Sequence, residues 1–368
     1  MTDTATDLIT EGTTELLVFL PKTSSKGPSI RGKVPFYNPS MELNRDISIL
    51  VNQWLLNTCT KHIHILDGLA ASGIRGLRLA HELSGDFEVT INDWSEQSFA
   101  LIQQNIQRFS LPNVSVFQRD LGCLLKERRF HSIDIDPFGS PVYFFDDAVQ
   151  SVYNKGIIAC TATDTAALCG VFPRVCYRRY AAWPLHGPSM HEIGLRILLG
   201  SLCRETAQYD RGIDPLLCYA TDHYIRLYVR ITNGKQAADA SMAQYRSIPA
   251  KDVPLTKDNN KSVGPLWMGN IQNKAVLQAI RSLVSTKQFN TRNMLLPLLF
   301  SLEDEAEAPP FFYTTNDLSS LLKASPPSMA LLFERLRRKG FFVSRTHCTP
   351  TGFKTDAPLD VITEVFKR

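Results

Sequence analysis

The sequence predicts an α/β protein with a Rossmann-like, mostly parallel sheet that ends in an antiparallel hairpin, followed by a smaller α+β domain. Short apolar strands alternate with helical segments over residues 62–164, a pattern typical of right-handed βαβ units. A glycine-rich turn follows the first of these strands, and an acid stands at or just beyond the end of each of four strands. The 368 residues are enough for about two domains.

The hydrophobic pattern places each element along the chain. Residues 34–46 are expected to form a loop that leads into a helix, because apolar residues then recur at helical spacing. Residues 62–83 and 88–109 each indicate a strand, a turn and an amphipathic helix. Further elements are three short strands at residues 113–120, 131–139 and 155–164, a long helix at residues 191–210, and a hairpin at residues 215–231 that closes the sheet.

A polar segment rich in Lys, Asn and Pro, residues 232–267, is the best candidate for a domain boundary. We therefore predict two domains, residues 1–233 and residues 234–368. Within the second, residues 315–356 indicate helix, turn, helix and two short strands, which is the order of a winged helix. A small α+β packing module fits the same pattern equally well.

Composition limits the class of protein. Hydrophobic residues make up 44% and charged residues 21%, as in soluble globular proteins, and no apolar run has the length of a membrane span. Residues 1–12 have neither a basic start nor an apolar signal core, so a cytoplasmic protein is expected. The net charge of +4 permits nucleic-acid binding without requiring it.

The eight cysteines are scattered singly and form no Cys-x-x-Cys motif, so we expect buried thiols and no structural metal. Cys169 is interpreted in the same way, as a buried thiol rather than a nucleophile. His191, His223 and His347 lack the spacing of metal ligands and are expected to be structural or to lie at the rim of a site.

The run from Asp67 to Gly76 follows a strand and opens a helix, which suits close approach of a ligand to the backbone. Its glycines do not spell G-x-G-x-x-G, and no Gly-Lys-Ser/Thr follows, so dinucleotide and triphosphate sites are disfavoured. A nucleoside without pyrophosphate remains. With Asp67 and Gly68 at the turn and Asp93 placed to bind ribose hydroxyls, the pattern points to S-adenosyl-L-methionine.

Four acids follow four successive strands, each at or just beyond the strand end. They are Asp67, Asp93, Asp120 and Asp136. The carboxyl ends of parallel strands lie along one edge of a sheet, where α/β proteins bind ligands. A single acid there is most simply a helix cap or a solvated strand end. Four of them indicate one shared crevice.

The last of these acids begins the sequence Asp136, Pro137, Phe138. An exocyclic amine on a nucleobase is a weak nucleophile, because its lone pair is delocalised into the ring. A carboxylate and a backbone carbonyl that accept its two hydrogens would localise that pair, and an aromatic ring would hold the base. We interpret Asp136 as the general base, although a helix N-cap is the alternative explanation for it.

Seven motifs together resemble one family. They are "PFYNPSMELNRD", "LDGLAASGIRGLR", "IDIDPFGSP", "TATDTAALCG", "DHYIRLYVR", "GPLWMG" and "RTHCTPTGFKTDAP". They occur in this order in the tRNA guanine-26 N2-dimethyltransferases, and the resemblance covers nearly the whole chain. It implies a class I methyltransferase domain with S-adenosyl-L-methionine, a C-terminal domain, and two successive methyl transfers to the guanine amino group.

The resemblance also implies roles for individual residues. It places Arg45 and Arg75 near the methionine end of the cofactor, Asp93 on its ribose, and Asp120 and Leu121 at its adenine. It assigns the guanine pocket to Phe36, Asp136, Pro137 and Phe138, with Asp136 as the catalytic acid. The cysteine-bearing segments of longer family members are missing from this sequence, which is similar to the compact archaeal form.

The partner implied is tRNA, with no membrane and no obligate protein partner evident. The target guanine must be turned out of the stack, and phosphate contacts should come from basic residues on the same side as the pocket. The candidates are Arg174, Arg178 and Arg179 in the first domain, and Arg335, Arg337, Arg338, Lys339, Arg345 and Lys354 in the second. A solvated helix face is the alternative for each group.

Two other functions stay open on sequence grounds. One is an amino-methyltransferase acting on another base, such as adenine in DNA or ribosomal RNA, since acid-Pro-aromatic motifs serve those reactions too. The other is an RNA-binding protein without chemistry, against which the acids at residues 93 and 136 count. The sequence leaves open whether one or two methyl groups are added.

Overall fold

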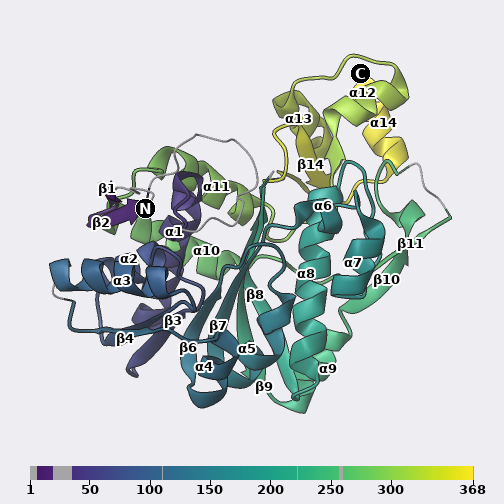
Figure 1. The fold of residues 1–368 in the computed structure, drawn as a ribbon. Helices are drawn as coiled ribbons and strands as arrows, with labels where there is room; N and C mark the ends of the chain where they lie inside the picture. Colours follow the sequence, from purple (N-terminus) through teal and green to yellow (C-terminus); the bar gives the residue numbers. More distant parts are fainter. Residues whose placement is uncertain (1–5, 20–34, 110, 222, 257–259, 368) are drawn as a thin grey trace.

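The computed structural model describes residues 6–19, 35–109, 111–221, 223–256 and 260–367. They form a large body around a seven-stranded sheet and a smaller body that carries the C-terminal helix (Figure 1). Among the described residues, no helix is both long enough and apolar enough to cross a membrane.

The large sheet has the strand order β5-β4-β3-β6-β7-β9-β8. The first five strands of this order are parallel, β9 is antiparallel to β7, and β8 is antiparallel to β9. The predicted mostly parallel sheet with a terminal hairpin is confirmed. Its strands are β3 (Ile63–Asp67), β4 (Phe87–Asn92), β5 (Val114–Phe117), β6 (Phe130–Ile135), β7 (Val152–Ala162), β8 (Arg211–Ala220) and β9 (Ile225–Asn233).

The strand order reverses at β3, since β4 and β5 lie on one side of it and β6 on the other. At such a switch point the connections leave in opposite directions and open a crevice beyond the carboxyl ends of the strands. The topology of the sheet therefore explains why a site is expected at the ends of β3, β4 and β6.

Helices cover both faces of the sheet and bury two separate apolar cores. The first helical layer includes α1 (Glu42–Thr58), α2 (Ile74–Glu82), α3 (Glu96–Phe109), α10 (Lys274–Leu283) and α11 (Arg292–Asp304). The second layer includes α4 (Leu121–Glu127), α5 (Phe145–Ser151), α6 (Thr165–Leu168), α7 (Pro173–Tyr180) and α8 (Met190–Ala207). Short 3-10 turns lie at Pro39–Met41, Val142–Phe144, Ala250–Asp252 and Val284–Thr286.

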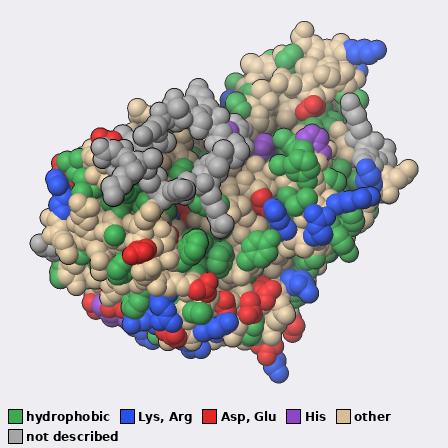
Figure 2. Space-filling view, viewed as in Figure 1, with side chains coloured by type: hydrophobic (Ala, Val, Ile, Leu, Met, Phe, Trp, Pro, Cys, Tyr) green, Lys and Arg blue, Asp and Glu red, His purple; other side chains and the backbone are tan. Residues whose placement is uncertain are grey.

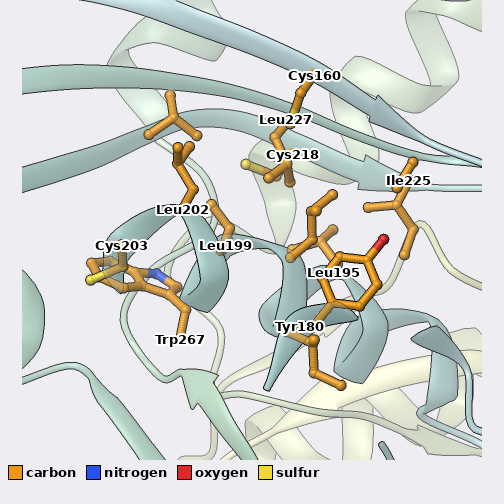
Figure 3. Packing of buried hydrophobic residues seen from close by; sticks show 14 of the residues in the cluster. Cys160, Tyr180, Leu195, Leu199, Leu202, Cys203, Cys218, Ile225, Leu227 and Trp267 are labelled. Atoms are coloured by element: carbon orange, nitrogen blue, oxygen red, sulfur yellow. The ribbon is translucent and has the colours of Figure 1, made fainter. Parts of the chain in front are cut away.

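The helix α8 is apolar almost all round, because it is enclosed by the sheet on one side and by later segments on the other. Figure 3 shows Leu195, Leu199 and Leu202 of α8 among side chains of β7, β8 and β9, with Trp267 of β11 nearby. These leucines are fully buried, and each buried leucine stabilises the fold by roughly 1.5–3 kcal/mol.

The segment after residue 233 packs on the large body, which differs from the predicted division at residues 233 and 234. The strands β10 (Tyr245–Pro249) and β11 (Ser262–Trp267) contribute to one core of the sheet, and α10 and α11 contribute to the other, while α9 (Lys235–Met242) packs on β8. A third core begins only at Leu318. The polar segment at residues 232–267 is therefore a connection on the surface of the large body and not the boundary between two domains.

The smaller body has the predicted order of helix, helix, strand and strand. It contains β12 (Tyr313–Thr314), α12 (Thr315–Leu322), α13 (Met329–Arg338), β13 (Val343–Arg345), β14 (Gly352–Thr355) and α14 (Leu359–Lys367), with the sheet order β12-β14-β13. A hairpin near the other end of the chain, β1 (Thr6–Glu11) and β2 (Thr14–Phe19), was not expected. Its signal is two short runs of strand-forming residues, TDLITE and TELLVF, on either side of Gly12.

The cysteines are more varied than predicted. Five are buried, including Cys169, whereas Cys59 and Cys348 are half-buried and Cys123 is exposed. Burial raises the pKa of Cys169 to about 12, so its thiol stays protonated at neutral pH and is a poor nucleophile. The expectation of a buried thiol at position 169 is confirmed, and the one for Cys123 is wrong.

Candidate active site

A cavity of about 770 Å³ opens at the carboxyl ends of β3, β4 and β6. Its walls contain every predicted catalytic and cofactor residue except Gly68, namely Phe36, Arg45, Asp67, Arg75, Asp93, Asp120, Leu121, Asp136, Pro137 and Phe138. The four acids at the strand ends therefore share one crevice, as predicted. Another cavity, of about 590 Å³ beside β8 and α10, contains none of the predicted site residues.

The glycine turn allows the backbone to pass close to its neighbours. A Cβ on Gly68 would lie 3.0 Å from the carbonyl oxygen of Asp134 and 3.0 Å from the Leu121 side chain. Gly73 caps α2 with a φ of +78°, in the left-handed region that favours glycine. The Gly76 amide donates to Asp67 Oδ2 (2.8 Å). The turn thus has a packing role as well as lining the cavity on either side of Gly68.

Asp67 is buried beneath the cavity, 2% exposed. Burial raises the pKa of its carboxyl to about 7, while Arg75 lowers it and Asp134 raises it further. The side chain connects the end of β3 to α2, because it accepts a hydrogen bond from the Gly76 amide. Asp67 therefore supports the glycine turn from below.

The carboxylate of Asp93 is held at the end of β4 by two backbone amides. Its Oδ2 accepts from Ala71 (2.8 Å) and its Oδ1 from Ser95 (2.9 Å). Each oxygen keeps a further lone pair, so this fixed carboxylate can still accept two ribose hydroxyls. Asp120 caps α4 by accepting from the Cys123 amide (3.1 Å), and the buried Leu121 follows it into the wall.

Asp136 follows β6, and its side chain is 22% exposed. Arg75 of α2 donates from Nη2 to Asp136 Oδ2, and from Nη1 to Asn44 Oδ1 (2.8 Å) and Ser48 Oγ (2.6 Å). The resemblance placed Arg75 at the methionine end of the cofactor. In the structure its guanidinium lines the cavity and lies against Asp136, where it fixes the direction of that carboxylate.

Two acceptors beside the cavity have no partner in the part of the chain that the structure describes. They are the second oxygen of Asp136, Oδ1, and the carbonyl oxygen of Pro137. The loop that carries them is tied to the end of β7, since the Gly139 amide donates to Thr163 Oγ1 (2.7 Å) and the Thr163 amide to the Gly139 carbonyl (2.9 Å). The motifs "DPFG" and "TATD" thus form one rigid corner.

The rings of Phe36 and Phe138 both line the cavity and contact each other edge to face. Their centroids are 5.3 Å apart and their planes differ by 65°. In this arrangement the two rings are in direct contact with each other. A base entering between them must separate the rings, which Phe138 can allow because it is 45% exposed.

Arg45 lines the cavity and also forms a buried ion pair. Its guanidinium donates to both carboxylate oxygens of Glu11, from Nε to Oε2 at 2.8 Å and from Nη2 to Oε1, and to the Asn38 carbonyl (3.1 Å). Glu11 comes from the β1–β2 hairpin, so sequence reasoning missed it. The charge of Arg45 is already neutralised, and a cofactor carboxylate could use only its remaining donors.

The predicted RNA-binding residues fall into two groups. Exposed on the surface are Arg174, Arg178, Arg179, Arg337, Arg338, Lys339 and Arg345, of which Arg179 pairs with Asp164, Arg338 with Glu334 and Lys339 with Glu364. Arg335 is half-buried and donates to the Val365 carbonyl (2.7 Å). The prediction for Lys354 is wrong, because it is 2% exposed and its Nζ lies 2.9 Å from Glu192 Oε2.

The Lys354→Met substitution should therefore lower stability and leave tRNA binding unchanged. Glu192 would keep Arg196 but lose its second cation, at a cost towards the low end of the roughly 3–5 kcal/mol for breaking a buried pair. Urea denaturation and tRNA titration measure the two effects, with exposed Lys323→Met as the control. Weaker tRNA binding by folded Lys354→Met would contradict this assignment.

The same cluster has a pH signature. Burial raises the pKa of Glu192, but Lys354 and Arg196 outweigh this and hold it at about 2. A lowered carboxyl pKa stabilises the fold above the ordinary value near 4.5, and this contribution is lost as the pH falls from there towards 2. The stability difference between wild type and Lys354→Met should shrink over that window.

Among the residues that the structure describes, one group of side chains has the spacing of metal ligands. His62, His64 and Glu88 place ligand atoms within 4.8 Å of one another at the amino-terminal end of β3 and β4, opposite the cavity. His62 Nδ1 already pairs with Asp86 (2.6 Å) and His64 Nδ1 with Glu88 (2.9 Å). These contacts account for the cluster as two surface ion pairs.

Comparison with known proteins decides the family. A model of the N2,N2-dimethylguanosine tRNA methyltransferase family matches residues 23–367. The chain belongs to this family. The tRNA (guanine(26)-N(2))-dimethyltransferase of Methanoregula boonei is 38% identical over 376 residues, covering 97% of each chain. The enzyme of the same name from Methanobrevibacter smithii is 36% identical over 352 residues, or 90% of this chain and 91% of that one.

A solved structure shows that the similarity extends from the sequence to the fold. Trm1 from Pyrococcus horikoshii, solved with S-adenosyl-L-methionine, matches with a TM-score of 0.87 and 35% identity, over 98% of this chain and 100% of that chain. The predicted class I methyltransferase fold and the family resemblance are thereby confirmed.

Proposed function

We propose that this protein transfers methyl groups from S-adenosyl-L-methionine to the exocyclic N2 amine of guanosine 26 in tRNA. Its membership of the family makes it a methyltransferase, and the relatives named above carry this activity in their names. The observation that carries the proposal is the pair of unpartnered acceptors, Asp136 Oδ1 and the Pro137 carbonyl, at the wall of one cavity with Asp93.

The residues of the cavity fit the cofactor. When bound, S-adenosyl-L-methionine supplies an electrophilic methyl group on a sulfonium. Asp93 would accept the ribose hydroxyls, and Asp120 and Leu121 would lie at the adenine. The glycine turn after Gly68, with Leu69, Ala70, Ala71 and Ser72 in the cavity wall, would lie along the cofactor.

The proposed chemistry uses the two acceptors on the target amine. Asp136 Oδ1 and the Pro137 carbonyl would each accept one N–H of the amine, which localises the lone pair and directs it at the methyl group. As the carbon–nitrogen bond forms, the bond from the methyl carbon to the cofactor sulfur would break, which leaves S-adenosylhomocysteine. Asp136 would then take the proton that the nitrogen releases. Arg75 holds Asp136 in direction throughout, and Phe36 and Phe138 position the purine ring.

Analysis of the product tests this function directly. Unmodified tRNA incubated with the protein and methyl-labelled cofactor should yield labelled dimethylguanosine after digestion to nucleosides. A transcript with adenosine at position 26 should stay unlabelled. Labelled methyladenosine would favour an amino-methyltransferase for another base, and tRNA binding without any label would favour a non-catalytic RNA-binding protein.

The partner and location follow from the substrate. We propose tRNA as the macromolecular partner, through the exposed basic residues of α7 and of the smaller body. A cytoplasmic location is proposed with it, because tRNA would be met there. The proposal needs no metal and no second protein.

A further inference from the structure

An exposed surface of aromatic and basic residues lies on α7 and just before and after it. We call it the α7 surface and define it by Phe172, Arg174, Tyr177, Arg178 and Trp183. Its three rings are large and open to solvent, with exposed fractions of 56% for Phe172, 49% for Tyr177 and 42% for Trp183. Exposed aromatic rings gathered on one surface mark interaction sites.

The two central rings form a fixed stack. The centroids of Tyr177 and Trp183 are 4.6 Å apart and their planes differ by only 17°. After α7, Ala181 adopts a left-handed conformation (φ 50°) that turns the chain back, and the Trp183 backbone exchanges hydrogen bonds with Gly264 of β11 at 2.8 and 2.7 Å. The platform is therefore held in place from two elements.

The charge on this surface is uncompensated. Arg174 and Arg178 are exposed and form no ion pair with any other residue that the structure describes. Arg179, by contrast, is neutralised by Asp164 (2.8 Å). Figure 2 shows Lys and Arg side chains gathered on the face of the molecule where α7 lies in Figure 1. A polyanion is the partner that this charge favours.

The α7 surface adjoins the mouth of the active-site cavity. Asp164 accepts from Arg179 and from the Tyr180 hydroxyl (2.7 Å), both on α7. The preceding residue, Thr163, lines the cavity and is hydrogen-bonded to Gly139 of the catalytic corner. Tyr143, 69% exposed, lines the cavity as well. A substrate strand leaving the cavity on this side meets α7 first.

We propose that the Tyr177–Trp183 stack receives an unpaired base of the tRNA next to the target guanosine, while Arg174 and Arg178 contact the adjoining phosphates. This rests on the proposed function. Turning a base out of RNA exposes its neighbours, and proteins stabilise such splayed bases by stacking them on aromatic side chains. The platform thus contributes affinity for the opened substrate without touching the reacting atoms.

Removing the rings should weaken tRNA binding selectively. Base stacking on an aromatic ring contributes roughly 1–3 kcal/mol, so Tyr177→Leu and Trp183→Leu should each raise the Kd or KM for tRNA roughly 5- to 150-fold. The kcat at saturating tRNA and the Kd for the cofactor should stay within about twofold. Phe300→Leu is the matched control, since Phe300 is 52% exposed on the distant helix α11.

Removing the charges should change the salt dependence. Arg174→Gln with Arg178→Gln should reduce the slope of log Kd against log salt by roughly 1.4–1.8 for two lost phosphate contacts. Arg108→Gln, an exposed arginine on α3, should leave the slope unchanged. Circular dichroism confirms that each variant is folded before it is titrated.

The outcomes separate this inference from the proposed function. If the wild-type protein made no methylguanosine, that result would contradict the proposed function itself. A wild type that methylates tRNA, with folded Tyr177→Leu and Trp183→Leu variants that bind it as tightly, would overturn the stacking role and leave the surface to another partner. Equal losses in Phe300→Leu would also overturn it, because the effect would not be specific to this platform.

Discussion

Asp136→Asn should lower kcat for methyl transfer by roughly 10²–10⁴-fold, with binding of tRNA and cofactor kept. An amide at this position can still accept one N–H of the target amine, but it cannot take the proton that the reaction releases. Arg75 would remain held by Asn44, Ser48 and Asp134, so the surrounding structure should survive. Single-turnover methylation at saturating tRNA measures the chemical step.

A matched acid controls for the loss of charge. Asp86→Asn removes an acid whose side chain is 78% exposed, at the amino-terminal end of the sheet, and should leave kcat unchanged. If Asp136→Asn retained kcat within a few-fold of wild type, Asp136 would not be the base. The structural alternative, a helix cap at position 136, predicts reduced stability instead, which thermal unfolding of the same variant would detect.

Arg226→Met should cost roughly 3–5 kcal/mol of folding free energy. Arg226 is fully buried on β9 and donates to both carboxylate oxygens of Asp134 and to Thr161 Oγ1 (2.9 Å). Without it, Asp134 would keep only Arg75, at 3.5 Å. The cost arises from leaving a buried carboxylate without its main counter-charge, and urea denaturation measures it.

Two further variants test this explanation. Arg230→Met breaks a partly exposed pair with Asp214 at 3.7 Å and should change stability by less than about 1 kcal/mol. Arg226→Met combined with Asp134→Leu should recover part of the loss, because apolar residues replace both charges. A double variant as unstable as the sum of the single ones would show that the pair itself is not the cause.

The ion pair between Arg226 and Asp134 also connects the stability of the fold to the corner formed by the "DPFG" and "TATD" motifs. Burial alone would raise the pKa of Asp134, but Arg226 and Arg75 outweigh burial and hold that pKa below its ordinary value. Arg75 contacts both Asp134 and Asp136, so the chain of charges runs from β9 to the cavity. Loss of Arg226 should therefore disturb methylation even in the fraction of molecules that stays folded.

Local patterns were sufficient where the interaction is local. The alternation of strands and helices follows from apolar periodicity, and the glycine turn between β3 and α2 was visible in the run from Asp67 to Gly76. The convergence of the four acids was predictable as well, because parallel strands end at one edge of a sheet. These features needed no knowledge of distant contacts.

Predictions failed where the partner is distant in sequence. Lys354 sits in a basic, loop-like stretch, yet it is buried against Glu192, more than 150 residues earlier. Glu11, the buried partner of Arg45, was missed because it lies on a hairpin that was not expected. Polarity over residues 232–267 suggested a domain boundary, whereas their few apolar side chains complete the core around α8. The composition of a segment indicates how exposed its residues are on average, but it does not show which individual charged side chains are buried.

The sequence by itself determined the α/β order, the edge of the sheet that binds ligands, and the acid-Pro-aromatic corner, since each depends on periodicity or on neighbouring residues. Only the tertiary structure decided which charges are neutralised and which stay available: Arg75 lies on Asp136, Glu11 occupies Arg45, and Arg174 and Arg178 remain without ion pairs among the described residues. The physical reason is that burying a charge requires a counter-charge at hydrogen-bond distance, and folding alone brings such partners together.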